Sequence, residues 1–241
     1  MATPAKTQKS GKPKLILTQP GKGGVGKTTV AAAIADYLIG KEISLEMLDA
    51  DERSGAGLAH FQQKAKRISI TKRDALDAIG NAVAGGSQVV LADMPAAREV
   101  ETGKWFADIA QGLSQVADII TICVISPDPG SIPPIIDWAK EIKGLTDYVL
   151  VRNEQGQPDC DWHFWQPKEM AFLEMTGGEV FDLKSVNPDL EAALRLHGET
   201  LARVAGGSAK PELSGLIWKI RAQSVWSHFA GQLLKSKFLN P

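Results

Sequence analysis

The segment of residues 15–38, LILTQPGKGGVGKTTVAAAIADYL, contains the pattern G-x-x-x-x-G-K-T. The apolar run before the pattern predicts a buried strand, and the alanine-rich run after it predicts a helix. Glycines let such a loop turn tightly, so that backbone N–H groups and the helix N-terminus point at phosphate oxygens. Lys27 then adds positive charge near the β- and γ-phosphates, and the Thr28 hydroxyl is a ligand for Mg²⁺. The pattern predicts a phosphate-binding loop whose nucleotide-contacting residues are Gly21, Lys22, Gly23, Gly24, Val25, Gly26, Lys27, Thr28 and Thr29.

Strand-like and helix-like segments alternate along the rest of the chain. Helical patterns such as 25–39 and 74–84 separate seven candidate strands, at residues 14–18, 43–48, 67–71, 88–93, 119–126, 148–152 and 180–183. Such alternation is typical of an α/β fold. We therefore expect a doubly wound, mainly parallel sheet flanked by helices, with ligands at the carboxyl ends of its strands.

Length and composition favour one substantial domain. The chain has 241 residues, 44% of them hydrophobic, which suffices for one α/β core with an appendage. Residues 1–13 carry three lysines and no acidic residue, so we expect a disordered basic tail. The phosphate-loop domain is expected over residues 14–205, and a C-terminal helix that packs on it or extends it over residues 206–241.

Charge, cysteine content and hydropathy indicate which partners and which cellular compartment to expect. The net charge of −1 gives no global argument for nucleic acid or a membrane surface, so such a partner would need a local patch. Cys123 and Cys160 do not make a disulfide framework, and the first residues lack the apolar region of a signal peptide. The longest apolar run, residues 119–125, is too short to cross a bilayer. We expect a cytoplasmic protein.

Acidic residues follow two of the candidate strands. Asp49 and Asp51 end the segment MLDAD, and Asp93 ends VVLAD. In a parallel sheet these carboxylates lie at the ligand-binding edge, where Asp49 and Asp93 can act with Thr28 around Mg²⁺ and Asp51 can reach an attacking water. The alternative for Asp49 and Asp51 is an Asx-rich turn after a strand.

The string GKGGVGKTT resembles the deviant phosphate loop of the ParA/MinD family of ATPases. The resemblance implies that Lys22 is a "signature" lysine, which reaches across a homodimer interface to the nucleotide of the partner subunit. It also implies ATP and Mg²⁺ as ligands, catalytic roles for Lys22, Lys27 and Asp51, and a second switch of the form D-x-P-x-G. Here Ala97 stands at the glycine position of that switch, a departure from the family pattern.

The segment YVLVRNEQG bears on the identity of the base. The guanine-reading motif N-K-x-D would need lysine at position 154 and aspartate at 156, where this chain has Glu154 and Gly156. GTP is therefore disfavoured. By resemblance to the family, Asn153 borders the adenine; the alternative is an asparagine that simply ends a strand.

The C-terminal segment has apolar residues at helical spacing and an excess of basic residues. Three interpretations stay open: a packing helix with a solvated basic face, a non-specific DNA-binding surface, and a membrane-associating terminus. Lys219, Arg221, Lys235 and Lys237 are spread along the segment, which slightly favours DNA over lipid.

Two further clusters are weaker signals. Cys160 and His163 lie at a ligand-like spacing without the second pair that a closed zinc site needs. The neighbouring Trp162, Phe164 and Trp165 can pack on the core or form a partner-binding patch.

These features together predict an ATP-dependent dimerising switch with slow ATPase activity. Its expected role is to partition or position DNA, such as a plasmid or chromosome, or another large cargo, with an activating adaptor protein of the ParB type. The first alternative is a metabolic ligase or synthetase of similar fold that uses ATP to activate a small molecule, and the second is an inactive scaffold that only binds nucleotide.

Overall fold

The protein is described by a computed structural model over residues 11–19, 21–50, 57–69, 73–96, 99–142, 144–158, 160, 162 and 166–240. Within these ranges the strands are β1 (Lys14–Thr18), β2 (Leu45–Asp49), β3 (Lys66–Arg67), β4 (Val89–Asp93), β5 (Asp118–Ile125), β6 (Asp147–Asn153) and β7 (Glu179–Leu183). The helices are α1 (Lys27–Gly40), α2 (Leu58–Phe61), α3 (Arg73–Ala84), α4 (Glu99–Val116), α5 (Pro133–Ile142), α6 (Gln166–Thr176), α7 (Pro188–His197), α8 (Leu201–Gly206) and α9 (Leu216–Lys235).

The strands form one sheet in the order β3-β2-β4-β1-β5-β6-β7, and every described pairing is parallel. The central strands β1, β4 and β5 are short apolar runs, as expected for strands that helices cover on both faces. The predicted α/β fold with a doubly wound, mainly parallel sheet is confirmed. The third predicted strand is shorter than expected, since β3 holds only Lys66 and Arg67.

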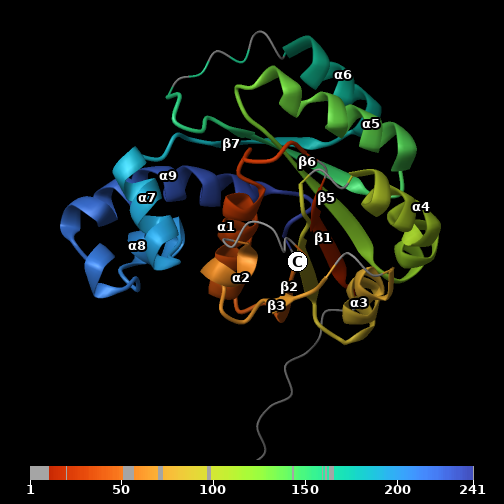
Figure 1. The fold of residues 1–241 in the computed structure, drawn as a ribbon, viewed down its shortest axis with the longest axis horizontal. Helices are drawn as coiled ribbons and strands as arrows, with labels where there is room; N and C mark the ends of the chain where they lie inside the picture. The colour runs from red at the N-terminus through yellow and green to blue at the C-terminus, as the bar shows by residue number, and fades with distance from the viewer. Residues whose placement is uncertain are drawn as a thin grey trace, which may run out of the picture.

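Two helical layers cover the sheet. Figure 1 shows α1, α7, α8 and α9 on one side of the strands and α3, α4 and α5 on the other. Each layer has its own hydrophobic cluster: Val30 and Ile34 of α1 belong to the first, and Phe106 of α4 and Trp138 of α5 belong to the second. Alternate residues of β1 serve the two clusters, with Ile16 in one and Leu17 in the other, because successive side chains of a strand point to opposite faces.

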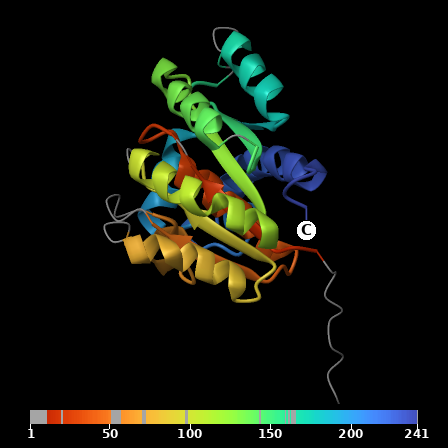
Figure 2. The same cartoon turned by 90° about the vertical axis from the view of Figure 1, so that its right-hand side faces the viewer.

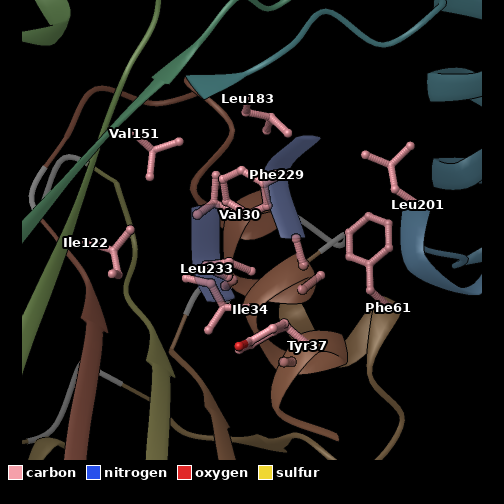
Figure 3. Packing of buried hydrophobic residues seen from close by; sticks show 14 of the residues in the cluster. Val30, Ile34, Tyr37, Phe61, Ile122, Val151, Leu183, Leu201, Phe229 and Leu233 are labelled. Atoms are coloured by element: carbon pink, nitrogen blue, oxygen red, sulfur yellow. The ribbon is translucent and has the colours of Figure 1, made fainter. Parts of the chain in front are cut away.

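Helix α9 is part of the first layer. Phe229 and Leu233 are almost fully buried and lie beside Val30 and Ile34 of α1 (Figure 3). The chain then returns to the amino end of the sheet, where the Lys14 ammonium donates to the Phe238 carbonyl at 2.8 Å (Figure 2). The side of α9 that carries Phe229 and Leu233 therefore packs against protein, whereas Leu216, Ile217 and Ile220 near its start are more than half exposed, so the packing interpretation of the C-terminal segment holds only for part of the helix.

No helix in the described part of the chain combines the length and the apolar character that a membrane span needs.

Candidate nucleotide-binding site

Three neighbouring strands end side by side at the carboxyl edge of the sheet. Thr18 of β1 and Asp49 of β2 are each in register with Asp93 of β4, which lies between them. The phosphate loop follows β1 directly, so the sheet brings two of the predicted carboxylates beside it. This edge is where a doubly wound sheet binds its ligands.

The loop itself has the backbone that only glycines adopt easily. Gly24 and Gly26 have φ of 81° and 97°, in the left-handed region. Gly26 is the N-cap of α1, and no side chain caps the first turn of this helix. The N–H groups of that turn and the positive end of the helix dipole thus face the loop, an arrangement suited to an anion.

Lys27 folds back over this loop. Only 7% of the residue is exposed, and its ammonium donates to the carbonyls of Gly21 at 3.1 Å and Lys22 at 3.3 Å. The loop therefore closes around a cationic group, which is the charge that a bound phosphate chain needs.

Asp93 is the most deeply buried carboxylate of the site, with no exposed surface. Its Oδ1 accepts from the Thr18 hydroxyl at 2.6 Å, whereas its Oδ2 has no hydrogen-bond partner within the described ranges. Burial raises the pKa of Asp93 to about 6; the Thr18 and Thr28 hydroxyls lower it, Asp49 raises it further, and Lys27 lowers it. A buried oxygen without a partner, beside a hydroxyl and a second carboxylate, fits a Mg²⁺ site formed by Thr28, Asp49 and Asp93.

Asp49 also holds the short helix α2. It is 3% exposed, and its Oδ2 accepts from the Ala59 backbone N–H at 2.9 Å. Gly57, which precedes α2, allows this approach, because a Cβ at that position would lie 2.5 Å from Asp49 Oδ2. Any ligand that engages Asp49 therefore acts next to the start of α2.

The end of β6 contacts the phosphate loop from the other side. The Asn153 amide donates to the Val25 carbonyl at 2.9 Å, and the Gln155 amide donates to the Gly24 carbonyl. Both residues also line a pocket that begins at Gly26 and continues along α1. The remaining lining residues come from α1, α2, the turn after β6, β7, the loop after β7, α7, the turn before α8, and α8: Thr29, Ala32, Ala33, Phe61, Gly156, Leu183, Val186, Glu191, Leu194, Arg195, Glu199, Thr200 and Leu201. The structure thus provides a largely apolar pocket beside the loop, with Asn153 at its edge.

Lys22 lies on the outer side of the loop. Its ammonium forms an ion pair with Asp128 at 2.6 Å, and both side chains are about half exposed. The other oxygen of Asp128 accepts from the Gly130 N–H at 2.7 Å, and the pKa of Asp128 is lowered, chiefly by the hydrogen bond from Lys22. Within its own chain, the Lys22 ammonium is therefore paired with Asp128, whereas the Lys27 ammonium binds the carbonyls of the loop.

Several predicted residues lie outside the described ranges: Asp51, Ala97, His163, Phe164 and Trp165. The described residues contain no group of three or more His, Cys, Asp or Glu that could hold a metal ion. Trp162 packs against the second hydrophobic cluster. Cys123 is fully buried in β5, as predicted, and burial raises the pKa of its thiol.

Sequence reasoning missed Thr18, Asp128 and Gln155 as site residues. Thr18 carried a local signal, since it is a polar residue at the end of an otherwise apolar strand just before the loop. Asp128 and Gln155 carried none, because each meets the loop across more than 100 residues of chain.

Comparison with known proteins supports this fold. No family model matches the sequence, and no curated protein does either. Among solved structures, the chain is similar to the MinD cell division protein of Aquifex aeolicus, with a TM-score of 0.57 and 15% identity, over 93% of this chain and 98% of that one. It is also similar to the MinC:MinD cell division protein complex of the same organism, with a TM-score of 0.55 and 15% identity, over 93% of this chain and 97% of that one. At this identity the similarity shows the fold, and it agrees with the resemblance of the loop sequence to the ParA/MinD family.

Proposed function

We propose that this protein is an ATP-dependent dimerising switch of the ParA/MinD type with slow ATPase activity. The observation that supports this proposal best is the placement of a second loop lysine. Lys27 folds over the loop, whereas the Lys22 side chain of the same loop is half exposed and pairs with Asp128. A half-exposed cation there can reach a nucleotide held by a second copy of the chain.

Each residue of the site has a role in this proposal. Backbone N–H groups of the loop and the Lys27 ammonium bind the phosphates of ATP and lower the repulsion among their charges. Thr28, Asp49 and Asp93 hold Mg²⁺, which when bound neutralises charge on the β- and γ-phosphates. Asp51 orients the attacking water.

The dimer step requires Lys22 to leave Asp128. Exposed ion pairs contribute little to stability because solvent screens them, so the exchange of partners costs little. A triphosphate enclosed between two subunits offers Lys22 several charged oxygens in place of one carboxylate. ATP binding thereby favours the closed dimer, and hydrolysis favours its opening.

The proposed biological role is to position a large cargo, with plasmid or chromosomal DNA first among the candidates. One of the similar structures is described as a complex of MinD with MinC. We infer that this chain likewise works with a second protein, an adaptor that sets the hydrolysis rate.

The experiment that tests this function compares two lysines of the same loop. We expect Lys22→Ala to bind ATP but to stay monomeric, and Lys27→Ala to bind ATP at least about tenfold more weakly, because it loses a charged phosphate ligand. Binding is measured by isothermal titration, and assembly by size-exclusion chromatography with a non-hydrolysable ATP analogue.

Lys41→Ala is the matched control, since Lys41 is exposed and lies at the far end of α1. It should bind and dimerise like the wild type. A wild-type protein that stays monomeric with the analogue, or a Lys22→Ala variant that dimerises normally, contradicts the proposal.

A further inference from the structure

Glu154 occupies an unusual position for a charged residue. It is only 4% exposed, and it directly follows β6, between the two residues that contact the phosphate loop. A buried carboxylate is costly unless hydrogen bonds compensate both of its oxygens. The hydrogen-bond partners of Glu154 therefore indicate its structural role.

Both oxygens of Glu154 are bound by the segment that follows β7. Oε1 accepts from the Lys184 ammonium at 2.7 Å, and Oε2 accepts from the Ser185 backbone N–H at 2.9 Å. The Glu154 N–H itself donates to the Leu183 carbonyl at 3.1 Å. The segment of residues 183–185 is therefore attached to the end of β6 by three separate interactions.

The side chains of the two residues next to Glu154 contact the phosphate loop instead. The side chains of Asn153 and Gln155 bond to the carbonyls of Val25 and Gly24 in the phosphate loop. Gln155 adopts φ of 41°, a strained value for a residue with a side chain, and this backbone turn precedes Gly156. Residues 153–155 thus join the phosphate loop to the segment after β7.

These joined segments are two walls of the pocket. Gly26, Asn153 and Gln155 line it on the loop side, and Leu183 and Val186 line it on the other. Glu154 does not line the pocket, but its hydrogen bonds connect the end of β6, next to Asn153, with the stretch that leads to Val186. A displacement of residues 183–186 would open the wall without touching the phosphate loop.

We propose that Glu154, through Lys184 and Ser185, is a positioning residue for the base of the nucleotide. This inference rests on the proposed function, because it takes the pocket beside the loop to be the base site. Because both of its carboxylate oxygens already accept hydrogen bonds, Glu154 positions the pocket wall and does not itself bind the base. The phosphate cradle, which Lys27 and the loop backbone form, is contacted by Asn153 and Gln155, so we expect it to persist when the Glu154 interactions are lost.

The test separates the base from the phosphates by using two ligands. ATP carries both, whereas inorganic tripolyphosphate carries only the phosphate chain. We expect Glu154→Ala to weaken ATP binding about tenfold and to leave tripolyphosphate binding within about twofold of wild type, as measured by isothermal titration with Mg²⁺. Lys184→Met, which keeps the Ser185 hydrogen bond, should show the same pattern with a smaller loss for ATP, about threefold.

Asp182→Asn is the matched control. Asp182 is also a carboxylate next to the pocket segment, but it pairs with Arg152 at 2.7 Å and does not line the pocket. It should bind both ligands like the wild type.

Each outcome decides a different point. If Glu154→Ala and Lys184→Met lose equal affinity for both ligands, these residues support the phosphate loop as a whole. If ATP binding is unchanged in both variants, the pocket wall needs no such support. Either result overturns the inference. If Glu154→Ala does not fold, Lys184→Met carries the same comparison. A wild-type protein that binds neither ligand would instead contradict the proposed function.

Discussion

Gly26 lies in the phosphate loop where the Asn153 side chain at the end of β6 approaches it. A Cβ built at this position would clash with Nδ2 of Asn153, and φ of 97° adds backbone strain for any other residue. Gly24, two residues earlier, also has a positive φ, of 81°, but a Cβ there would meet nothing within 4 Å. The two glycines therefore separate the effect of backbone conformation from that of close approach.

We expect Gly24→Ala to lower the free energy of unfolding by about 1 kcal/mol, from backbone strain alone. Gly26→Ala should lower the free energy of unfolding by about 1–3 kcal/mol more, because the Asn153 amide must move and its hydrogen bond to Val25 is lost. Urea denaturation of both variants measures the difference.

The double variant Gly26→Ala/Asn153→Ala is the check on the cause. Removal of the Asn153 amide should make the alanine at position 26 less costly than it is in the wild-type background. Equal losses of unfolding free energy for Gly24→Ala and Gly26→Ala would show that the approach of Asn153 does not limit position 26.

Among the elements, α8 is tied to α1 and α2 by a buried polar cluster. Asp36 of α1 accepts from the Gln62 amide at 2.7 Å and from the Thr200 hydroxyl. Arg203 of α8 lies 3.8 Å from Asp36, bonds to Glu199 at 3.2 Å and donates to the Phe61 carbonyl of α2. The short helix α2, which follows β2 and Asp49, is thus fixed to α1 and α8, two of the helices that line the pocket.

The charge on Asp36 makes this junction sensitive to pH. Burial raises the pKa of Asp36, although the hydrogen bonds from Thr200 and Gln62 oppose the shift. An acid whose pKa is higher in the folded state holds its proton better there, so its favourable contribution falls as pH rises through that range. We expect Asp36→Asn to gain in free energy of unfolding relative to wild type as pH rises above the ordinary pKa of an aspartate, about 3.9.

Chemical denaturation at several pH values measures this difference. Asp137→Asn serves as the control, because the Asp137 side chain is 78% exposed. A difference between Asp36→Asn and wild type that stays constant with pH, or that moves toward wild type as pH rises, would contradict the prediction.

At the scale of the whole molecule, the basic residues of the C-terminal segment form two separate groups. Lys219 and Arg221 lie in the first turns of α9, whereas Lys235 and Lys237 lie at its other end, about 24 Å away along the helix. Arg221 also donates to Asn187 at 3.3 Å, and Lys237 donates to the Gly177 carbonyl at 3.2 Å. The C-terminal segment of one chain therefore presents two small basic sites, which a dimer would double.

We expect ATP-loaded protein to bind random duplex DNA with a steep salt dependence, since phosphate contacts release condensed counterions. Replacing either pair, Lys219/Arg221 or Lys235/Lys237, with alanine should lower the slope of log affinity against log salt by up to about 1.8. Retention on immobilised DNA across a salt series measures the slope. An unchanged slope in both variants would place any DNA surface elsewhere, and sedimentation with anionic liposomes without DNA binding would favour a membrane partner.

Features that depend on a few consecutive residues could be predicted from the sequence alone. The phosphate loop between β1 and α1, the carboxylates after β2 and β4, and the parallel sheet all follow from local spacing and hydrophobic pattern, because backbone geometry links neighbouring residues directly. The strand order, the contacts of Asn153, Glu154 and Gln155, and the partner of Lys22 came only from the tertiary structure. Many carboxylates and amides in the chain could satisfy such groups equally well, and only the packed fold brings one of them within hydrogen-bonding distance.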